Sequence, residues 1–335
     1  MTLPSTNENY LKLVQSIGET IEEARNRAVK AVNIELLRAN WEIGKFIVEF
    51  EQNGNEKADY GSSLLEKLAK DLRERFGKGF SKSNVYLMRL FYIKFPIFQT
   101  LSGKLSWSHY AELLGISDDT SREFYIKQCE SENWSVRELK RQISSSLFER
   151  LALSKDKEGV LQLAKQGLTI SEPKDIVKDP YVLEFLKISE EIRMTESNLE
   201  QKIIDNLQVF LLELGKGFSF VGRQYRITLD NEHFYVDLVF YHRILKCFVL
   251  IDLKTRHVKH YDIGQMNLYL NYFKTEENTE GDNPPIGIVL GADKNDILVE
   301  YAIGGISNNI FVSKYQLYLP DKKQLVEKVK ELINK

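Results

Sequence analysis

The hydrophobic pattern divides the chain into a helical first part and a mixed second part. From residue 10 to about residue 150, apolar residues recur every three or four positions, which is the period of an amphipathic helix, and no strand pattern stands out. The sequence therefore predicts an all-helical domain. The expected helices are Tyr10–Val29, Ile34–Phe50, Ser62–Phe76, one running to Phe95 with Ser81 as its N-cap, Trp107–Leu114, Ser121–Cys129 and Ser135–Leu151.

The pattern after residue 196 mixes helical periods with short apolar runs. Turn residues at Asp230-Asn231 and His242-Arg243 separate three of these runs and predict an antiparallel meander. The expected order is helix Leu199–Leu214, strands Phe218–Leu229, Phe234–Tyr241 and Cys247–Leu253, helix Asp262–Lys274, strand Ile286–Leu290, helix Asp296–Ile303, strand Ile310–Val312 and helix Lys322–Ile333. This order predicts one mixed sheet flanked by helices, and an α+β chain as a whole.

The length of 335 residues favours two domains. We expect a helical domain at residues 1–153 and an α/β domain of the restriction-endonuclease-like type at residues 196–335. The more polar segment 154–195 contains Pro173 and Pro180 and is interpreted as a connector with one short helix.

Composition is that of an ordinary globular protein, with 43% hydrophobic and 28% charged residues. No apolar run reaches the roughly 20 residues of a membrane helix, and the N-terminus lacks a signal pattern. The two cysteines, Cys129 and Cys247, form neither a disulfide framework nor a zinc cluster. We expect a cytoplasmic protein without membrane contact. Because the net charge is −2, binding to nucleic acid must rest on local basic patches.

Two acids and a lysine interrupt adjacent apolar strands. Asp237 lies in one strand, and Asp252 and Lys254 end the next, two positions apart and so on one face. A buried charge is costly unless it is paired. Two aspartates and the Leu253 carbonyl can hold Mg²⁺, and Lys254 can orient or deprotonate an attacking water or stabilise developing charge. The alternative is a surface ion pair at the sheet edge.

Several longer motifs resemble one family of nucleases. In the second part they are Phe220–Tyr225, Asp237–His242, Ile251–Lys254 and Gly264–Asn271, and in the first part Phe76–Ser81, Leu105–Tyr110 and Trp134–Leu139. Together they resemble the YhcG-like family, which combines a helical N-terminal domain with a PD-(D/E)xK nuclease domain. The resemblance covers nearly the whole chain.

This resemblance implies a set of site residues. Asp237 and Asp252 become metal ligands, Lys254 the catalytic lysine and Gln265 a site residue on the following helix. It also implies an acid from the first core helix. Glu200 fits, since it falls on the apolar face formed by Leu199, Ile203, Ile204, Leu207, Phe210, Leu211 and Leu214. The alternative for Glu200 is a capping box with Ser197.

The sequence departs from the family pattern in three places. Val236 replaces the nominal proline, Asp252 replaces the more usual glutamate, and Thr255–Lys259 differs from what the family shows after the lysine. The nearby His242, His257 and His260 lack the spacing of a zinc site and are interpreted as surface residues.

A basic stretch marks the candidate nucleic-acid surface. Residues 67–94 hold eight lysines and arginines against Asp71 and Glu74, a net charge of +6. A helix, a Gly77-Lys78-Gly79 turn and a second helix form a pair of the helix-turn-helix kind. The candidate contacts are Arg75, Lys78, Lys82, Ser83, Asn84 and Arg89. The alternative is the solvated face of an ordinary helical bundle.

These observations favour a Mg²⁺-dependent DNA endonuclease, in which Mn²⁺ can replace Mg²⁺ and the helical domain binds or orients the substrate. RNA is not excluded as the substrate. The rival interpretation is a nucleic-acid-binding or assembly protein with a weak or inactive nuclease core. The sequence leaves the oligomeric state, including a homodimer, open.

Overall fold

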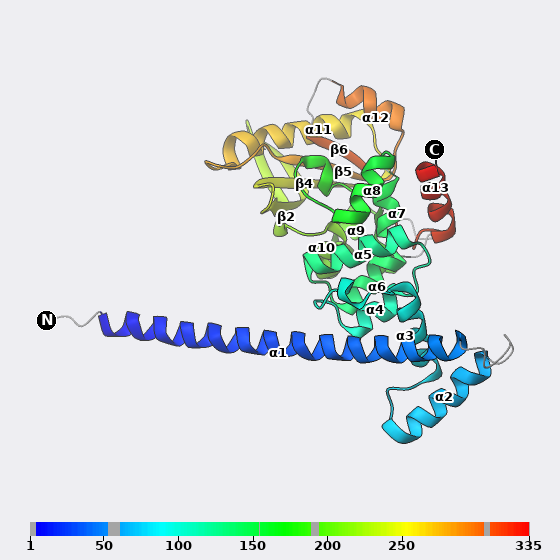
Figure 1. Cartoon of the computed structure of the whole chain (residues 1–335). Coiled ribbons are helices and arrows are strands. Elements are labelled where there is room, and N and C mark those ends of the chain that lie inside the picture. The colour runs from blue at the N-terminus through cyan, green and yellow to red at the C-terminus, as the bar shows by residue number, and fades with distance from the viewer. Residues whose placement is uncertain (1–4, 53–60, 154, 189–193, 305–308, 335) are drawn as a thin grey trace. The chain divides into compact units, whose positions relative to one another are not determined.

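The computed structural model describes residues 5–52, 61–153, 155–188, 194–304 and 309–334 (Figure 1). The chain forms two compact units. The helical unit comprises Met1–Arg122 and Cys129–Leu139, and the sheet unit comprises Glu123–Gln128 and Lys140–Lys335. In the described residues, no helix combines the length and the apolar character that a membrane crossing requires.

The helical unit is built on one long helix, α1 (Ser5–Gln52). The C-terminal part of α1 packs against α3 (Lys82–Lys94), and a Cβ atom at Gly44 would lie only 2.0 Å from the Met88 carbonyl oxygen. Only glycine therefore permits this close helix crossing. This unit also contains α2 (Gly61–Phe76) and α4 (Trp107–Leu113), whereas the residues of α5 (Asp119–Glu132) and α6 (Val136–Ser144) are divided between the two units.

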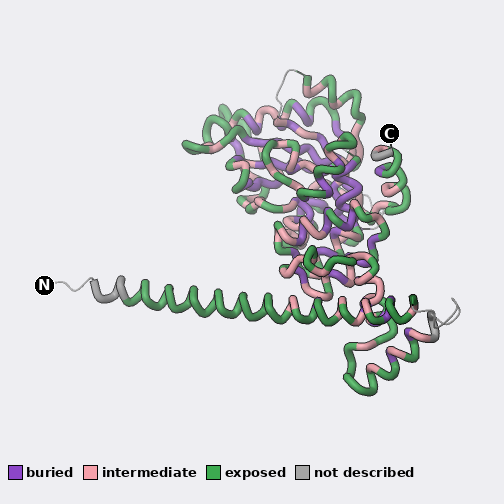
Figure 2. The backbone as a smooth tube through the Cα atoms, viewed as in Figure 1, coloured by how far each residue is buried: buried purple, intermediate pink, exposed green. Residues whose placement is uncertain are grey.

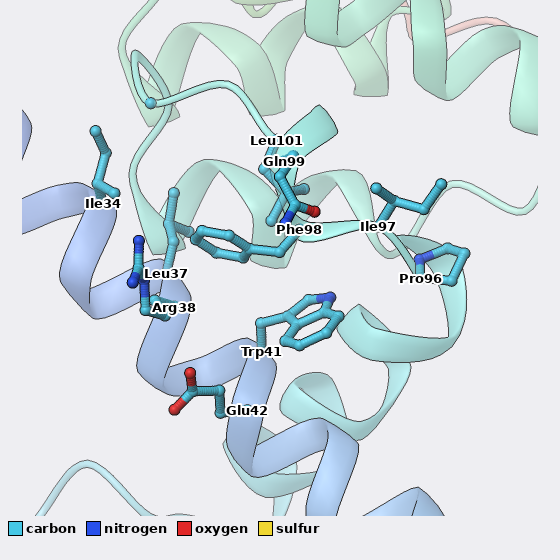
Figure 3. Close-up of a pocket in the computed structure, with 11 residues that line it drawn as sticks. Ile34, Leu37, Arg38, Trp41, Glu42, Pro96, Ile97, Phe98, Gln99 and Leu101 are labelled. Carbon is cyan, nitrogen blue, oxygen red and sulfur yellow. The ribbon is translucent and has the colours of Figure 1, made fainter.

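Aromatic side chains fix one face of α1. The Trp41 ring lies edge-on to Tyr92 at 5.0 Å and to Phe98 at 5.9 Å between centroids, and its indole N–H donates to the Phe95 carbonyl at 2.7 Å. Figure 3 shows Leu37 and Trp41 rising from α1 toward the segment that carries Phe98, beside an open pocket of about 650 Å³. This face of α1 is therefore occupied within its own unit.

The helix predictions hold for the region as a whole but fail at two joints. Tyr10–Val29 and Ile34–Phe50 are one continuous helix, because the intervening Lys30–Asn33 contains no glycine or proline. Conversely, Ser135–Leu151 divides into α6 and α7 (Leu147–Ala152), since Ser146 adopts a left-handed φ of 52°. The N-cap at Ser81 is confirmed by the 3.2 Å hydrogen bond from the Asn84 backbone N–H to its hydroxyl.

The sheet unit contains a six-stranded mixed sheet in the order β1-β6-β5-β4-β3-β2. Strands β2 (Phe218–Leu229), β3 (Glu232–His242) and β4 (Cys247–His257) form the predicted antiparallel meander. From β4 onward the pairing is parallel, through β5 (Ile286–Asp293), β6 (Ile310–Gln316) and β1 (Tyr181–Val182). The predicted mixed sheet is thus confirmed.

Helices cover both faces of this sheet. Leu199 and Ile203 of α9 (Glu196–Asp205) and Phe210 of α10 (Leu207–Leu214) pack with Ile251 and Leu253 on one face. Ile263, Met266 and Tyr269 of α11 (His260–Tyr272) pack with Val236 and Leu250 on the other. Figure 2 shows this unit's interior as buried tube. The unit also contains α8 (Lys157–Gln166), α12 (Asp296–Ile303) and α13 (Lys322–Asn334).

Two features of the sheet unit differ from the expected pattern. The helix predicted over Leu199–Leu214 breaks at Asn206 into α9 and α10. The segment interpreted as a connector supplies β1, and its Tyr181 and Leu183 are buried in the sheet core. Polar composition concealed this short strand, because two residues carry no readable alternation.

Candidate active site

The candidate site forms where β3 and β4 separate. Their ladder runs from His242 opposite Cys247 to Leu238 opposite Ile251, while β4 continues to pair with β5 through Lys254 opposite Gly291 and, after a register shift, to His257 opposite Asp293. Past Ile251 the β3 edge of β4 is open. The Leu253 backbone N–H then donates to Asp237 Oδ2 at 2.7 Å. A carboxylate thus takes the place of a strand partner, and this brings Asp237 beside the end of β4.

Asp252 is buried with too few partners. Its side chain lies 2.6 Å from the Lys254 ammonium, and the residue is 2% exposed. The two groups form an ion pair, yet in the described residues no aligned hydrogen bond reaches Asp252 Oδ2. Burial, together with the nearby Asp237 carboxylate, raises the pKa of Asp252 to about 7. Such an acid is costly as a purely structural group.

Lys254 remains a cation in this environment. Burial by itself lowers the pKa of a lysine, but the adjacent Asp252 carboxylate outweighs that effect and the pKa of Lys254 is raised. Lys254 is therefore suited to stabilising negative charge. It is poorly suited to accepting a proton in the state that the structure describes.

Gln224 links two of the expected acids. Its side-chain amide donates to Glu200 Oε2 at 2.5 Å and to Asp237 Oδ1 at 3.0 Å. Gln224 has a φ of 46°, a left-handed conformation that is costly for a residue with a Cβ atom. This backbone twist aims the amide at both carboxylates. Glu200 is buried, and burial followed by the neighbouring Asp237 charge raises its pKa.

The capping alternative for Glu200 is wrong. Helix α9 begins at Glu196, and its N-cap is Thr195, whose hydroxyl accepts from the Asn198 backbone N–H at 3.2 Å. Glu200 therefore lies in the second turn of the helix, directed at the sheet, where it meets Gln224. The sequence did not identify Gln224 as a site residue. The one available signal was Gly222, since an interior strand glycine often marks a bulge, and the β2–β3 register shifts between Phe220 and Gly222.

Gln265 lies near the site but contacts a tyrosine. Its amide donates to the Tyr269 hydroxyl at 2.6 Å, and that hydroxyl donates to the Tyr235 carbonyl at 3.0 Å. Burial comes first among the causes that raise the pKa of Tyr269, and the charge of Asp252 also contributes. Gln265 and Tyr269 therefore lie next to the acidic residues of the candidate site. The structure brings together Asp237, Asp252, Lys254, Glu200 and Gln224. Gln265 lies next to this group and contacts Tyr269.

The surface interpretation holds for two histidines and fails for the third. His257 is exposed beside Asp293 at 3.2 Å, and His260 is exposed. His242 is buried: its Nδ1 accepts from the Leu245 backbone N–H at 3.1 Å, so its Nε2 donates to the Lys216 carbonyl at 3.0 Å. Burial lowers the pKa of His242. Through these two hydrogen bonds, His242 stabilises the turn between β3 and β4.

The segment Thr255–Lys259, which differs from the family pattern, is held to the start of α11 by contacts with Asp262. Arg256 binds the buried Asp262 carboxylate through two N–H groups, each at 2.8 Å, and lies 5.2 Å from the Tyr261 ring centroid. The Lys259 backbone N–H donates to the same carboxylate at 2.8 Å. These contacts fix the start of α11 relative to the end of β4.

The donor set fits a hard divalent cation of the Mg²⁺ kind. Within the described ranges, no group of three or more histidine, cysteine, aspartate or glutamate side chains is arranged to hold a metal. Mg²⁺ commonly uses only one or two carboxylates and keeps several waters. Asp252 Oδ2, buried without an aligned hydrogen bond, and Asp237 supply two carboxylates. The N–H and C=O of a strand residue point to the same side, so the Leu253 carbonyl also faces the open edge.

The basic stretch is only partly available for binding. Lys82 is paired with Glu66, Arg89 with Glu51 at 2.8 Å, and Lys94 with Asp119 at 3.4 Å. The Asn84 side chain donates to the Gly79 carbonyl at 2.5 Å and accepts from Trp107. Among the candidate contact residues, Arg75, Lys78 and Ser83 are exposed to solvent. The open positive charge is thus greatest on α2 and the Gly77–Gly79 turn, whereas the sequence placed most contacts on α3.

Fold and acids together define a restriction-endonuclease-like core of the PD-(D/E)xK type. Residues 174–330 match the family described as the YhcG PDDEXK nuclease domain, and residues 16–150 match the DUF1016 N-terminal domain. The chain is 39% identical to "Putative nuclease YhcG" of Escherichia coli (strain K12), over 97% of this chain and 94% of that protein. The chain belongs to the YhcG family.

Solved structures match a smaller part of the chain. A repair endonuclease from Pyrococcus abyssi shares 20% identity over 39% of this chain, with a TM-score of 0.28, and the EndoMS–dsDNA2 complex shares 18% over 40%, with a TM-score of 0.27. The chain spans about half the length of each of these structures.

Proposed function

We propose that this protein is a Mg²⁺-dependent endodeoxyribonuclease whose site is formed by Asp237, Asp252 and Lys254. The observation that carries the proposal is the buried Asp252 carboxylate, whose Oδ2 pairs with the Lys254 ammonium at 2.6 Å while burial and the nearby Asp237 carboxylate still raise its pKa to about 7. A structural acid normally acquires a full set of partners. A divalent cation supplies the missing one.

The chain's own residues divide the chemistry among them. Asp237, Asp252 and the Leu253 carbonyl would hold the cation, which when bound would act as a Lewis acid and lower the pKa of a water molecule. Lys254, kept protonated by Asp252, stabilises the charge that develops on the phosphate. Glu200 is linked to the site by Gln224, whose side-chain amide donates to the carboxylates of both Glu200 and Asp237. Gln265 and Tyr269 form the wall on the α11 side. Mn²⁺ is expected to replace Mg²⁺, because both accept oxygen ligands.

The helical region at residues 1–153 is the proposed DNA-binding domain, followed by the segment 154–195 and the nuclease domain 196–335. Support comes from Arg75, Lys78 and Ser83, which are exposed at the end of α2, in the turn and at the start of α3. Arginine, lysine and serine at such positions suit contact with phosphates. We propose DNA as the substrate partner and the cytoplasm as the place of action.

The test is a cleavage assay on supercoiled plasmid and on single-stranded DNA and RNA, with Mg²⁺, Mn²⁺ or EDTA. Wild type should cleave DNA with either metal and lose all activity in EDTA. Asp252→Asn should lower the cleavage rate by at least about a hundredfold. The matched control is Glu276→Gln, a carboxylate-to-amide change at an exposed position, which should retain full activity. Cleavage by Asp252→Asn at the wild-type rate would refute the site.

A further inference from the structure

Helix α1 has a second apolar face that its own unit leaves exposed. The row consists of Tyr10, Val14, Ile17, Ile21, Ala28, Val32, Leu36, Ala39, Ile43, Phe46 and Phe50, with Arg25 filling the position between Ile21 and Ala28. At about 100° per residue, the row lies roughly opposite Leu37, Trp41 and Val48, which pack within the helical unit. Tyr10 is 63% exposed and Phe46 64% exposed. Figure 2 shows α1 as exposed tube over most of its length.

Such a row needs an occupant. An isolated helix gains little stability from propensity, and most helical stability comes from packing an apolar face. Tyr10, Val14, Ile17, Ile21, Val32 and Leu36 all rank among the exposed large hydrophobic side chains of the described residues. Contiguous exposed apolar surface of this length marks an interaction site.

The C-terminal end of the row opens into a groove of matching character. Ile43, Phe46 and Phe50 of α1 face α2 across a cavity of about 560 Å³. The other wall is equally apolar, and it consists of Leu64, Leu68, Leu72 and Phe76 of α2 together with Phe80. Figure 1 shows α2 and α3 gathered at the C-terminal part of α1, whereas the N-terminal half of α1 extends beyond them. A helix with an apolar face fits a groove of this kind.

We propose that a second copy of this chain covers the row, with the two α1 helices antiparallel and the N-terminal half of each lying in the α1–α2 groove of the other. Apart from Leu36, whose mirror position is Ala24, the row is symmetric about residue 30, so an antiparallel copy matches its other apolar positions pair by pair. Tyr10 meets the partner's Phe50, Val14 the partner's Phe46, and Ile17 the partner's Ile43. Near the centre, Ala28 meets the partner's Val32. A surface that complements itself in this way is the requirement for a two-fold dimer.

Charge selects the antiparallel direction. Arg25 and Glu35 are the charged residues that lie within about 40° of the row's centre line, equally far from residue 30 on opposite sides. In an antiparallel pair, Arg25 is level with the partner's Glu35. In a parallel pair, Arg25 is level with the partner's Arg25, and like charges at one level oppose pairing.

The available area is sufficient for a stable dimer. The row spans residues 10 to 50, which at 1.5 Å per residue is about 60 Å. A strip of that length and one helix wide, about 10–12 Å, covers on the order of 700 Å². A standard interface removes about 800 Å² from each partner. The row and its groove together meet this size. This inference is independent of the proposed nuclease activity.

The first test is the mass of the full chain by sedimentation equilibrium at micromolar concentrations. Wild type should be a dimer. Ile17→Glu places a charge in the row and should raise the dimer dissociation constant by about a hundredfold or more, while the near-UV circular dichroism that reports the packed aromatic cores stays unchanged. Asn26→Glu is the matched control, since it adds the same charge on the opposite side of α1 and should leave the dimer intact. A monomeric wild type, or a dimer that survives Ile17→Glu, overturns the proposal.

The second test concerns direction. A mixture of Val14→Cys and Phe46→Cys chains should form the mixed disulfide, since these positions are level in the antiparallel pair; the native Cys129 and Cys247 are buried. Val14→Cys alone should not crosslink to itself. Arg25→Glu should weaken the dimer, and Arg25→Glu combined with Glu35→Arg should restore it. Self-crosslinking of Val14→Cys, or the absence of rescue by the charge exchange, rejects the antiparallel arrangement.

Discussion

Two buried carboxylates in the sheet unit have opposite environments. Glu213 is 0% exposed and accepts from Arg150 at 2.8 Å, Arg141 at 3.1 Å and the Val182 backbone N–H at 2.9 Å. Burial by itself would raise its pKa, but Arg150, Lys178 and Arg141 outweigh burial and lower the pKa of Glu213 to about 2. Asp252 is equally buried, pairs with one lysine and faces a second acid, and its pKa is raised to about 7.

The difference is the one we expect between a structural acid and the proposed metal-binding acid. Glu213 has enough donors to compensate its loss of water, so it ties α6, α7 and β1 to the end of α10. Asp252 has one lysine as its charged partner and faces a second acid, and it is the acid that we propose accepts a cation. Burial alone would not have distinguished the two residues; the number and charge of their partners does.

The largest expected effect comes from breaking the well-paired acid. Glu213→Gln removes the carboxylate whose charge Arg150, Lys178 and Arg141 share, and it should lower the free energy of unfolding by about 3–5 kcal/mol. Chemical denaturation measures this change. Glu276→Gln, the exposed control, should change it by less than about 0.5 kcal/mol. Equal stability of the two variants would show that the Glu213 cluster contributes little.

Gln224 offers a smaller effect that sharpens the comparison on the functional side. Gln224→Ala removes the amide that joins Glu200 to Asp237, and we expect a cleavage rate lower by about 10- to 100-fold and a higher metal concentration for half-maximal activity. Gln208→Ala, an exposed glutamine on α10, is the control and should behave as wild type.

Backbone strain at Gln224 gives a second measurement. Because glycine tolerates a φ of 46° and alanine does not, Gln224→Gly should be more stable than Gln224→Ala by about 1 kcal/mol while losing the same activity. Greater stability of the alanine variant would contradict the strained conformation.

His242 predicts the smallest effect, a pH dependence of stability. Its pKa is lowered by burial, so the folded chain holds it neutral, while the unfolded chain protonates it near its ordinary value of about 6.5. The stability that His242 contributes is therefore present above about pH 6.5 and is lost as the pH falls below it, by up to about 1.4 kcal/mol per pH unit. His242→Gln should flatten the melting-temperature profile between about pH 8 and 5. His260→Gln, which alters an exposed histidine, should keep the wild-type slope; a His242→Gln slope as steep as wild type would count against the mechanism.

Local patterns in the sequence predicted most of the fold. The bounds of β2 and α12 match because turn residues and caps mark their ends, and the meander followed from Asp230-Asn231 and His242-Arg243. The joint expected between Tyr10–Val29 and Ile34–Phe50 was wrong, because the residues between them include no glycine or proline that would end a helix. Helical period alone cannot locate such joints.

The candidate site was predictable only where charge interrupts apolar strands. Asp237, Asp252 and Lys254 met that condition, and Glu200 stood out on an apolar helix face. Gln224 did not, because its role depends on a left-handed backbone and on two acids from other elements. The structural role of Glu213 could not be predicted, since its partners Arg141 and Arg150 lie more than sixty residues upstream. Contacts between distant segments leave no local signal.

The most direct test of the central claim is calorimetric titration of the full chain with Mn²⁺ and with Mg²⁺ in the absence of DNA. The undersupplied Asp252 predicts a divalent-cation site in the wild type and in Glu276→Gln, and its loss in Asp252→Asn. Removal of Glu213 should not abolish binding in any fraction that remains folded. Equal cation affinity in the wild type and Asp252→Asn would contradict the assignment of Asp252 as the acid that the protein leaves for a metal.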